Sequence, residues 1–124
     1  MSVVDTPSRT RVAILGCTGS IGTQALDVCK QHSDKLEVVA LSAHSRTENL
    51  VHFAHEFAVR HVAVTSEAHR GDAVLSELPS ACELHTGSRC AEELVELEDV
   101  DVVLVAIVGA AGLSASHAVL KSGK

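Results

Sequence analysis

Aromatic residues are nearly missing from this chain of 124 residues, which has two Phe and neither Trp nor Tyr. Modules that bind single-stranded nucleic acid by stacking bases on aromatic rings are therefore poor candidates. The formal net charge of −6, without a dense cluster of Lys and Arg, also argues against nucleic acid and anionic membranes as partners. The hydrophobic core must be built from Val, Leu, Ile and Ala, as in parallel sheets covered by helices.

Proline and long hydrophobic runs are also scarce. Only two residues are Pro while 46% are hydrophobic, so we do not expect disorder. No apolar run reaches the roughly 18 to 20 residues of a membrane-spanning helix, and the N-terminus has no signal-peptide pattern. The four cysteines include no C-x-x-C pair, which argues against a zinc knuckle or a disulfide framework. We expect a reduced, cytoplasmic protein without a membrane segment.

Patterns typical of strands and helices alternate five times along the chain. Apolar, β-branched runs predict strands at 11–15, 36–43, 61–65, 81–87 (weakly) and 100–108. Helical spacing of apolar residues predicts helices at 20–31, 46–58, 67–78, 88–98 and 110–124. Ser66 and Ser88 are expected to cap the third and fourth helices. This alternation predicts an α/β, three-layer, doubly wound parallel sheet of the Rossmann-like type.

The domain organisation follows from the same pattern. We expect a flexible leader at 1–10 and one Rossmann-like domain at 11–124. The final helix ends in "KSGK", a glycine-type stop, where a βαβ series would continue with another strand. We therefore expect a fold truncated after its last helix.

The segment "ILGCTGSIG" joins the first predicted strand to the first predicted helix through three glycines. Gly16 allows a tight turn, Gly19 leaves room for a phosphate, and Gly22 lets the helix pack closely. The helix that begins near Ser20 directs free N–H groups and its positive dipole end to the same place. Thr18 and Ser20 add hydroxyl donors. The pattern predicts a dinucleotide-phosphate site; a glycine turn that serves packing alone is the alternative.

The loop after the second predicted strand bears on the choice of cofactor. NAD-binding proteins usually place a carboxylate there to hold the ribose 2′-hydroxyl. This chain has no carboxylate before Glu48, and Ser45 and Arg46 stand where a 2′-phosphate would lie. An Arg guanidinium suits phosphate, so we expect NADP rather than NAD. A solvated polar loop is the alternative interpretation.

Other reactive side chains show no clear site. His52 and His55 match neither zincin pattern, and we interpret them as solvated residues of a helix face. Cys17 is expected to fill the glycine turn as a small residue, with redox sensing as the alternative. Asp99 and Asp101 flank a strand start without a visible partner. We therefore predict no metal site and no catalytic residue in this chain.

With these motifs in view, the chain resembles the 1-deoxy-D-xylulose 5-phosphate reductoisomerase family. The matching segments are "ILGCTGSIGTQALDV" (14–28), "VVALSA" (38–43) and "EDVDVVLVAIVGAAGL" (98–113). The resemblance spans about residues 11–124 and implies an N-terminal NADPH-binding domain. It also implies an oxidoreductase of the non-mevalonate isoprenoid pathway, which converts 1-deoxy-D-xylulose 5-phosphate to 2-C-methyl-D-erythritol 4-phosphate with Mg²⁺ or Mn²⁺.

The resemblance also assigns site residues. It implies NADPH phosphate contacts at Thr18, Gly19, Ser20 and Ile21, and contacts near the nicotinamide half at Ala106 and Ile107. The basic residue of the family's 2′-phosphate loop is displaced by one position here, to Arg46. The family's catalytic residues, metal ligands and substrate-phosphate residues are expected beyond Lys124, so the chain alone is expected to be inactive toward the phosphorylated sugar.

The full-length family is expected to form a homodimer. Two alternatives stay open: the cofactor domain of a semialdehyde or acyl-phosphate dehydrogenase, which has a similar glycine turn, and a non-catalytic Rossmann module that senses nucleotides.

Overall fold

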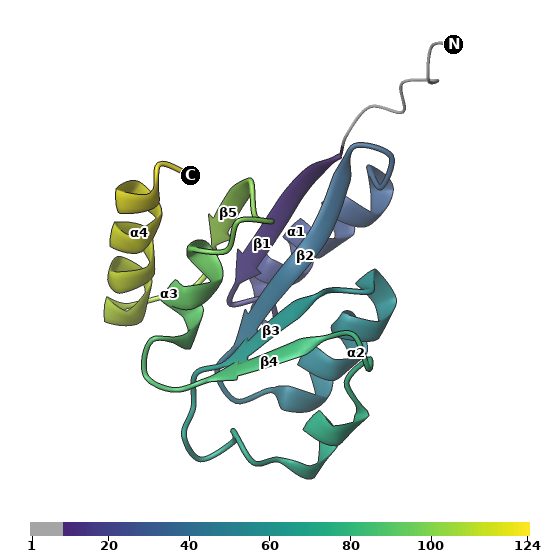
Figure 1. The fold of residues 1–124 in the computed structure, drawn as a ribbon, viewed down its shortest axis with the longest axis vertical. Coiled ribbons are helices and arrows are strands. Elements are labelled where there is room, and N and C mark those ends of the chain that lie inside the picture. Colours follow the sequence, from purple (N-terminus) through teal and green to yellow (C-terminus); the bar gives the residue numbers. More distant parts are fainter. Residues whose placement is uncertain (1–8) are drawn as a thin grey trace.

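A computed structural model describes residues 9–124 as one five-stranded parallel sheet with flanking helices (Figure 1). The strands are β1 (Thr10–Leu15), β2 (Leu36–Ala43), β3 (His61–Val64), β4 (Glu83–Thr86) and β5 (Val102–Val105). Their order across the sheet is β4-β3-β2-β1-β5. Residues 1–8 of the expected leader lie outside the described residues. Thr10 belongs to the sheet instead, because its N–H donates to the carbonyl of Lys35 at 2.8 Å.

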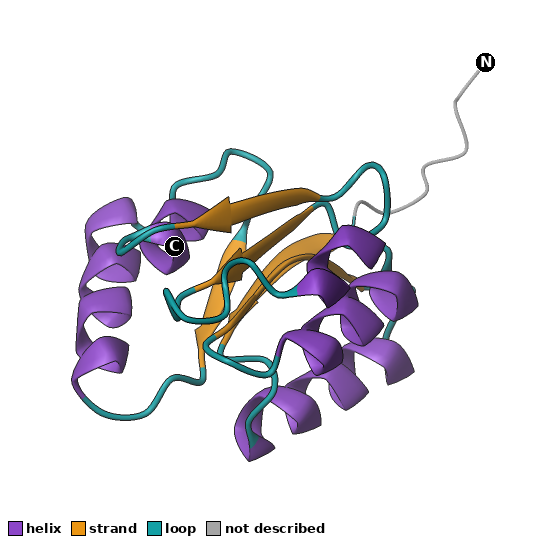
Figure 2. Cartoon of the chain, turned by 90° about the horizontal axis from the view of Figure 1, so that it is seen from below, coloured by secondary structure: helices purple, strands orange, loops and turns teal. Residues whose placement is uncertain are grey.

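Helices cover both faces of the sheet, which gives three layers (Figure 2). One face carries α1 (Ser20–Gln31), α2 (Thr47–Phe57) and the short 3₁₀ helix η1 (Ala73–Glu77). The other carries α3 (Cys90–Val95) and α4 (Ala110–Ser122). The predicted α/β, three-layer, Rossmann-like fold is confirmed.

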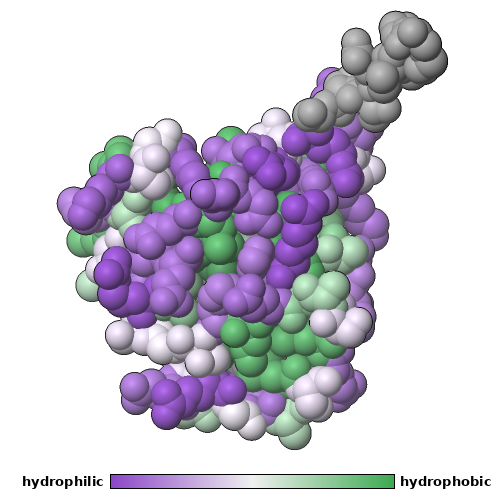
Figure 3. Space-filling view, in the orientation of Figure 1, coloured by the Kyte–Doolittle hydropathy of each residue, from purple (hydrophilic) through white to green (hydrophobic). Residues whose placement is uncertain are grey.

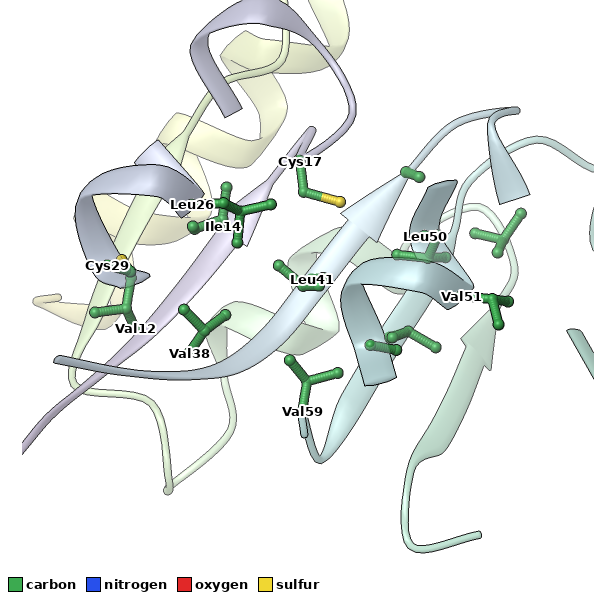
Figure 4. Packing of buried hydrophobic residues seen from close by; sticks show 14 of the residues in the cluster. Val12, Ile14, Cys17, Leu26, Cys29, Val38, Leu41, Leu50, Val51 and Val59 are labelled. Atoms are coloured by element: carbon green, nitrogen blue, oxygen red, sulfur yellow. The ribbon is translucent and has the colours of Figure 1, made fainter. Parts of the chain in front are cut away.

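Two hydrophobic clusters fill the space on either side of the sheet. Successive strand residues point to opposite faces, so Ile14 and Leu41 pack under α1 and α2, while Leu15 and Val39 pack under α3. Figure 4 shows Ile14, Leu41 and Cys17 converging in the first cluster. The central strands β1 and β2 are buried on both faces, which explains their nearly continuous apolar sequences.

The prediction of a helix at 67–78 is wrong. Residues 67–71 form turns, and only the short η1 follows, from Ala73. Ser66 caps no helix; its carbonyl accepts a hydrogen bond from the N–H of His69 at 3.2 Å. The Asp72 carboxylate accepts a hydrogen bond from the Thr47 hydroxyl at 2.6 Å and lies 3.0 Å from His69 Nδ1. These side-chain bonds hold the segment against the start of α2 and replace a regular helix.

Other predicted elements are present but shorter. The last strand was expected at 100–108, yet β5 pairs only with β1 and stops where that partner ends, at Leu15 opposite Val105. The fourth strand, expected at 81–87, is likewise limited to the four residues that pair with β3. The helix expected at 88–98 spans only Cys90–Val95, and Ser88 does not cap it, because Arg89 holds the N-cap position.

Polar side chains cover most of the face shown in Figure 3, and the largest hydrophobic area on it lies in the lower part. Elsewhere, large apolar side chains are exposed on β5 and α4, namely Val102, Leu104, Leu113 and Leu120. Within residues 9–124, no helix is both long enough and apolar enough to cross a membrane.

Candidate nucleotide-binding site

The carboxyl ends of β1 and β5 meet at the point where the strand order reverses. From β1 the chain adds β2, β3 and β4 on one side, and then returns to place β5 on the other side of β1. In open α/β sheets, ligands bind outside the carboxyl ends of the strands at such a switch point. The glycine turn (residues 16–19) follows β1 here, and Ala106 and Ile107 follow β5.

Gly16 brings these two strand ends into contact. It has a φ of +82°, a left-handed conformation that L side chains rarely adopt. A Cβ at this position would lie 2.8 Å from the carbonyl oxygen of Ala106 and 3.1 Å from Ile107 Cγ1. The N–H of Ala106 also donates to the carbonyl of Leu15 at 2.8 Å. The structure therefore brings the predicted residues Ala106 and Ile107 directly against the glycine turn.

Gly22 and Gly19 differ in what surrounds them. A Cβ at Gly22 would collide with the Gly16 carbonyl oxygen and lie 2.7 Å from Cys17 Cα, so close packing of α1 requires glycine there. A Cβ at Gly19 would meet only the Gly16 carbonyl oxygen, at 3.9 Å. Gly19 has φ −80° and ψ 177°, which any residue can adopt. Internal packing thus explains Gly16 and Gly22 but gives no reason for Gly19.

The N-terminus of α1 is free to receive an anion. Gly19 is its N-cap, no side chain caps the helix, and its first turn contains no acidic residue. The first N–H groups of a helix have no intrahelical partner and carry a positive partial charge. Ser20 and Ile21 are exposed at this end, and Thr18 is half-buried. Four predicted phosphate contacts therefore lie together around an uncapped helix end.

Ser42 on β2 holds the turn in place, and sequence reasoning missed it. Its carbonyl accepts the N–H groups of Gly16 at 3.0 Å and Cys17 at 2.9 Å. Its hydroxyl oxygen also accepts the Gly16 N–H, at 3.0 Å, and the residue is buried. The one available signal was a polar residue in the apolar run "VVALSA", because a buried hydroxyl needs a hydrogen-bond partner.

Cys17 points into the core instead of the crevice (Figure 4). Burial raises the pKa of its thiol to about 12, so the thiolate is not formed near neutral pH. The full burial of Cys17 and this raised pKa argue against a reactive redox thiol at this position. The interpretation of Cys17 as a small residue that fills the turn is confirmed.

The loop after β2 places Ser45 and Arg46 at the carboxyl edge of the sheet. Both residues are exposed, and Arg46 is the N-cap residue of α2. Within residues 9–124, the Arg46 guanidinium makes no ion pair. His44 Nδ1 lies 2.9 Å from the Thr65 hydroxyl, which ties this loop to the end of β3. The loop thus presents an unpaired cation on the same edge as the glycine turn.

Asp99 and Asp101 do have partners, contrary to expectation. Asp101 accepts hydrogen bonds from Arg11 through Nε at 3.1 Å and Nη2 at 3.0 Å, and these bonds lower the pKa of Asp101 to about 2. Asp99 contacts Arg60 and His61. These carboxylates belong to ion pairs at the start of β5, at the opposite edge from the glycine turn.

The two histidines of α2, His52 and His55, contact different groups. His52 is mostly exposed and lies 3.9 Å from Glu56, as expected of a solvated helix face. His55, although exposed, is not simply solvated, because its Nε2 lies 2.6 Å from the carbonyl oxygen of Glu77.

Sequence reasoning also missed a group of three side chains on β3 and β4. The potential metal-ligand atoms of His61, Glu83 and His85 all lie within 4.8 Å of one another. His61 and Glu83 are 22 residues apart, and only the pairing of the two strands brings them together. No spacing rule within one segment could have found this group.

Comparison with known proteins agrees with the fold and the turn. The family model described as 1-deoxy-D-xylulose 5-phosphate reductoisomerase matches residues 12–124. A reductoisomerase of Phocaeicola vulgatus is 40% identical over 116 residues, covering 92% of this chain and 30% of the relative. That of Ralstonia pickettii is 38% identical over 117 residues, covering 92% of this chain and 29% of the relative.

Solved structures give the same result. The Zymomonas mobilis reductoisomerase in complex with NADPH superposes with a TM-score of 0.85 at 28% identity, over 94% of this chain and 31% of that one. A reductoisomerase in complex with NADPH, fosmidomycin and magnesium gives a TM-score of 0.81 at 33% identity, over 93% of this chain and 28% of that one.

These matches cover nearly all of this chain but only part of each relative. The chain spans about 30% of the length of the curated relatives that it matches. The family model includes both the glycine turn and the end of β5, which sets aside the semialdehyde dehydrogenase alternative. The chain belongs to the 1-deoxy-D-xylulose 5-phosphate reductoisomerase family.

Proposed function

We propose that this chain binds NADPH at the carboxyl edge of the sheet, in the crevice between β1 and β5. The observation that carries the proposal is the open space at Gly19, beside an uncapped helix N-terminus. A Cβ added there would have the Gly16 carbonyl oxygen, at 3.9 Å, as its nearest atom outside the adjoining backbone, so the space suits a ligand that approaches the backbone. The solved relative in complex with NADPH, which has the same fold, supports this choice of ligand.

Each predicted contact has a physical role in the proposed complex. Residues 18–21 would hold the pyrophosphate through helix N–H groups, with hydroxyl donors from Thr18 and Ser20. Ile21 exposes 57% of its surface, and a bound cofactor would cover part of it. Ala106 and Ile107 would lie along the nicotinamide half, because they pack against the turn from the end of β5. When bound, NADPH supplies a hydride to the substrate.

Ser45 and Arg46 would select NADPH over NADH. A guanidinium can form two parallel hydrogen bonds with a phosphate, and Arg46 has no competing ion pair among the described residues. The ribose of NADH has a hydroxyl where NADPH carries the 2′-phosphate. NADH would therefore gain nothing from this cation.

The residues present do not fit magnesium. Magnesium requires oxygen ligands in octahedral geometry. Within residues 9–124, the one group of three or more metal-ligating side chains contains two imidazoles and a single carboxylate. No chemical step through magnesium can be derived from these residues.

We further propose that conversion of 1-deoxy-D-xylulose 5-phosphate to 2-C-methyl-D-erythritol 4-phosphate belongs to a homodimeric protein of the relatives' length. This chain would supply the NADPH-binding domain of that protein. A cytoplasmic location is supported by the four cysteines, which are all free.

Calorimetric titration with NADPH and NADH tests the proposal. We expect tighter binding of NADPH, and Arg46→Gln should lower the NADPH affinity at least tenfold while leaving NADH binding unchanged. Arg70→Gln removes the same charge from another exposed position and should behave as wild type. Equal affinity of the wild-type chain for both nucleotides would contradict the cofactor choice. An equal loss in both variants would contradict the role of Arg46.

A further inference from the structure

The strands β3 and β4 carry a second cluster of polar side chains, away from the nucleotide crevice. In their parallel pairing His61 lies opposite Glu83, and Ala63 lies opposite His85. Alternate residues of a strand share a face, so His61, Glu83 and His85 lie on one face of the sheet. It is the face packed by α3, because Ala63 belongs to that hydrophobic cluster. We propose that these three residues bind a zinc-class divalent metal ion and clip β4 to β3.

The distances between the ligand atoms of His61, His85 and Glu83 suit a single metal ion. His61 Nδ1 lies 3.3 Å from His85 Nε2 and 3.7 Å from a Glu83 carboxylate oxygen. Tetrahedral zinc with bonds of about 2.0–2.1 Å places its ligand atoms about 3.3–3.4 Å apart. The imidazole pair already has this spacing. The Glu83 side chain, which is 67% exposed, would have to rotate toward the imidazoles, because the three ligand atoms lie within 4.8 Å of one another.

Asp99 prepares His61 for metal binding. His61 Nε2 lies 3.2 Å from the Asp99 carboxylate, so an N–H at Nε2 donates to Asp99 and leaves the lone pair on Nδ1. That lone pair faces His85 and Glu83. Arg60 contacts the same Asp99 oxygen at 3.5 Å. Asp99 is therefore a positioning residue, and a carboxylate–histidine–metal arrangement of this kind is usual in zinc proteins.

The ligand types narrow the choice of metal. Two imidazoles and one carboxylate suit zinc, whereas magnesium and calcium prefer oxygen ligands. Three protein ligands leave a fourth position for water.

The place of the cluster in the sheet indicates what the ion would do. β4 is an edge strand of four residues that pairs only with β3. An ion that bridges these strands would stabilise the edge, because a ligand that binds only the folded state favours folding. This role is independent of NADPH, since the glycine turn follows β1, which β2 separates from β3 and β4 in the sheet.

Zinc titration of the chelator-treated, tag-free 124-residue chain tests the inference. We expect one saturable zinc ion per chain by calorimetry and a higher melting temperature with zinc. His85→Gln should lower the zinc affinity at least tenfold and abolish the rise in melting temperature. Glu83→Gln, at a mostly exposed position, should also weaken binding and gives the same test if His85→Gln does not fold. His52→Gln removes an exposed imidazole from α2 and should bind as wild type.

The free thiols need a control of their own. Cys82 precedes Glu83, but its side chain packs toward the opposite hydrophobic cluster. Cys82→Ala should therefore keep the site. A chain that binds no zinc would overturn the inference. So would equal binding by the wild-type, His85→Gln and Glu83→Gln chains, or loss of binding in Cys82→Ala alone.

Discussion

Replacing Gly19 by Val should weaken NADPH binding with little effect on the stability of the fold. The added Cβ would have the Gly16 carbonyl oxygen, at 3.9 Å, as its nearest atom outside the adjoining backbone, and the extended conformation of residue 19 is open to Val. Its cost to folding is confined to a poorer N-cap, about 1 kcal/mol or less. In the proposed complex, the same side chain would occupy the space of the pyrophosphate. We therefore expect at least a tenfold loss of NADPH affinity, which corresponds to about 1.4 kcal/mol.

Gly22→Val should show the opposite pattern. Its Cβ would lie 2.7 Å from Cys17 Cα, a backbone atom that cannot rotate away. Overpacking of this kind typically costs about 1–3 kcal/mol of unfolding free energy. Gly71→Val, at a glycine with no atom within 4 Å of an added Cβ, controls for a bulky residue at an open position.

Urea denaturation and calorimetric NADPH titration of the three variants provide the assay. We expect a stable Gly19→Val chain that binds NADPH weakly and a destabilised Gly22→Val chain. A Gly19→Val chain that binds NADPH as tightly as wild type, or a Gly22→Val chain of unchanged stability, would refute these roles of the two glycines.

Further predictions concern reactivity, pH and turnover. Cys17, with a pKa of about 12, should resist iodoacetamide at pH 8 in the folded chain and react after denaturation; rapid labelling of the folded chain would contradict its burial. The pKa of Asp101 falls from 3.8 to about 2 through Arg11, so its stabilisation is present above pH 3.8 and is lost as the pH falls through about 2. Asp101→Asn should therefore flatten the acid side of the stability profile measured by thermal unfolding, and a profile identical to wild type would count against the ion pair. The 124-residue chain should not oxidise NADPH in the presence of 1-deoxy-D-xylulose 5-phosphate and Mn²⁺, because it lacks a carboxylate metal cluster among the described residues; substrate-dependent loss of absorbance would disprove this.

The sequence predicts best where one local pattern controls the structure. The glycine turn has three glycines at fixed offsets between a strand and a helix, and Gly16 and Gly22 take the roles that their spacing predicts. The buried strands β1 and β2 also agree with their apolar runs, because both faces are covered. Family resemblance supplied Ala106 and Ile107, whose contact with the turn depends on the pairing of β5 with β1.

Features set by distant contacts were not predictable. The expected helix at 67–78 does not form, because Asp72 bonds to Thr47, which precedes it by 25 residues. His61 and His85 meet only through the register of β3 and β4. A polar residue in the apolar run of β2 indicates that Ser42 needs a hydrogen-bond partner, but it does not indicate that this partner is the glycine turn.

The most direct test of the central proposal is to map NADPH onto the chain by NMR. In ¹⁵N–¹H spectra, saturating NADPH should shift the amide signals of Gly19, Ser20, Ile21, Ala106 and Ile107, because these residues line the crevice at the carboxyl ends of β1 and β5. Signals of β4, at the far edge of the sheet, should stay in place. Shifts confined to β4, or none at saturating NADPH, would contradict the proposed cofactor site.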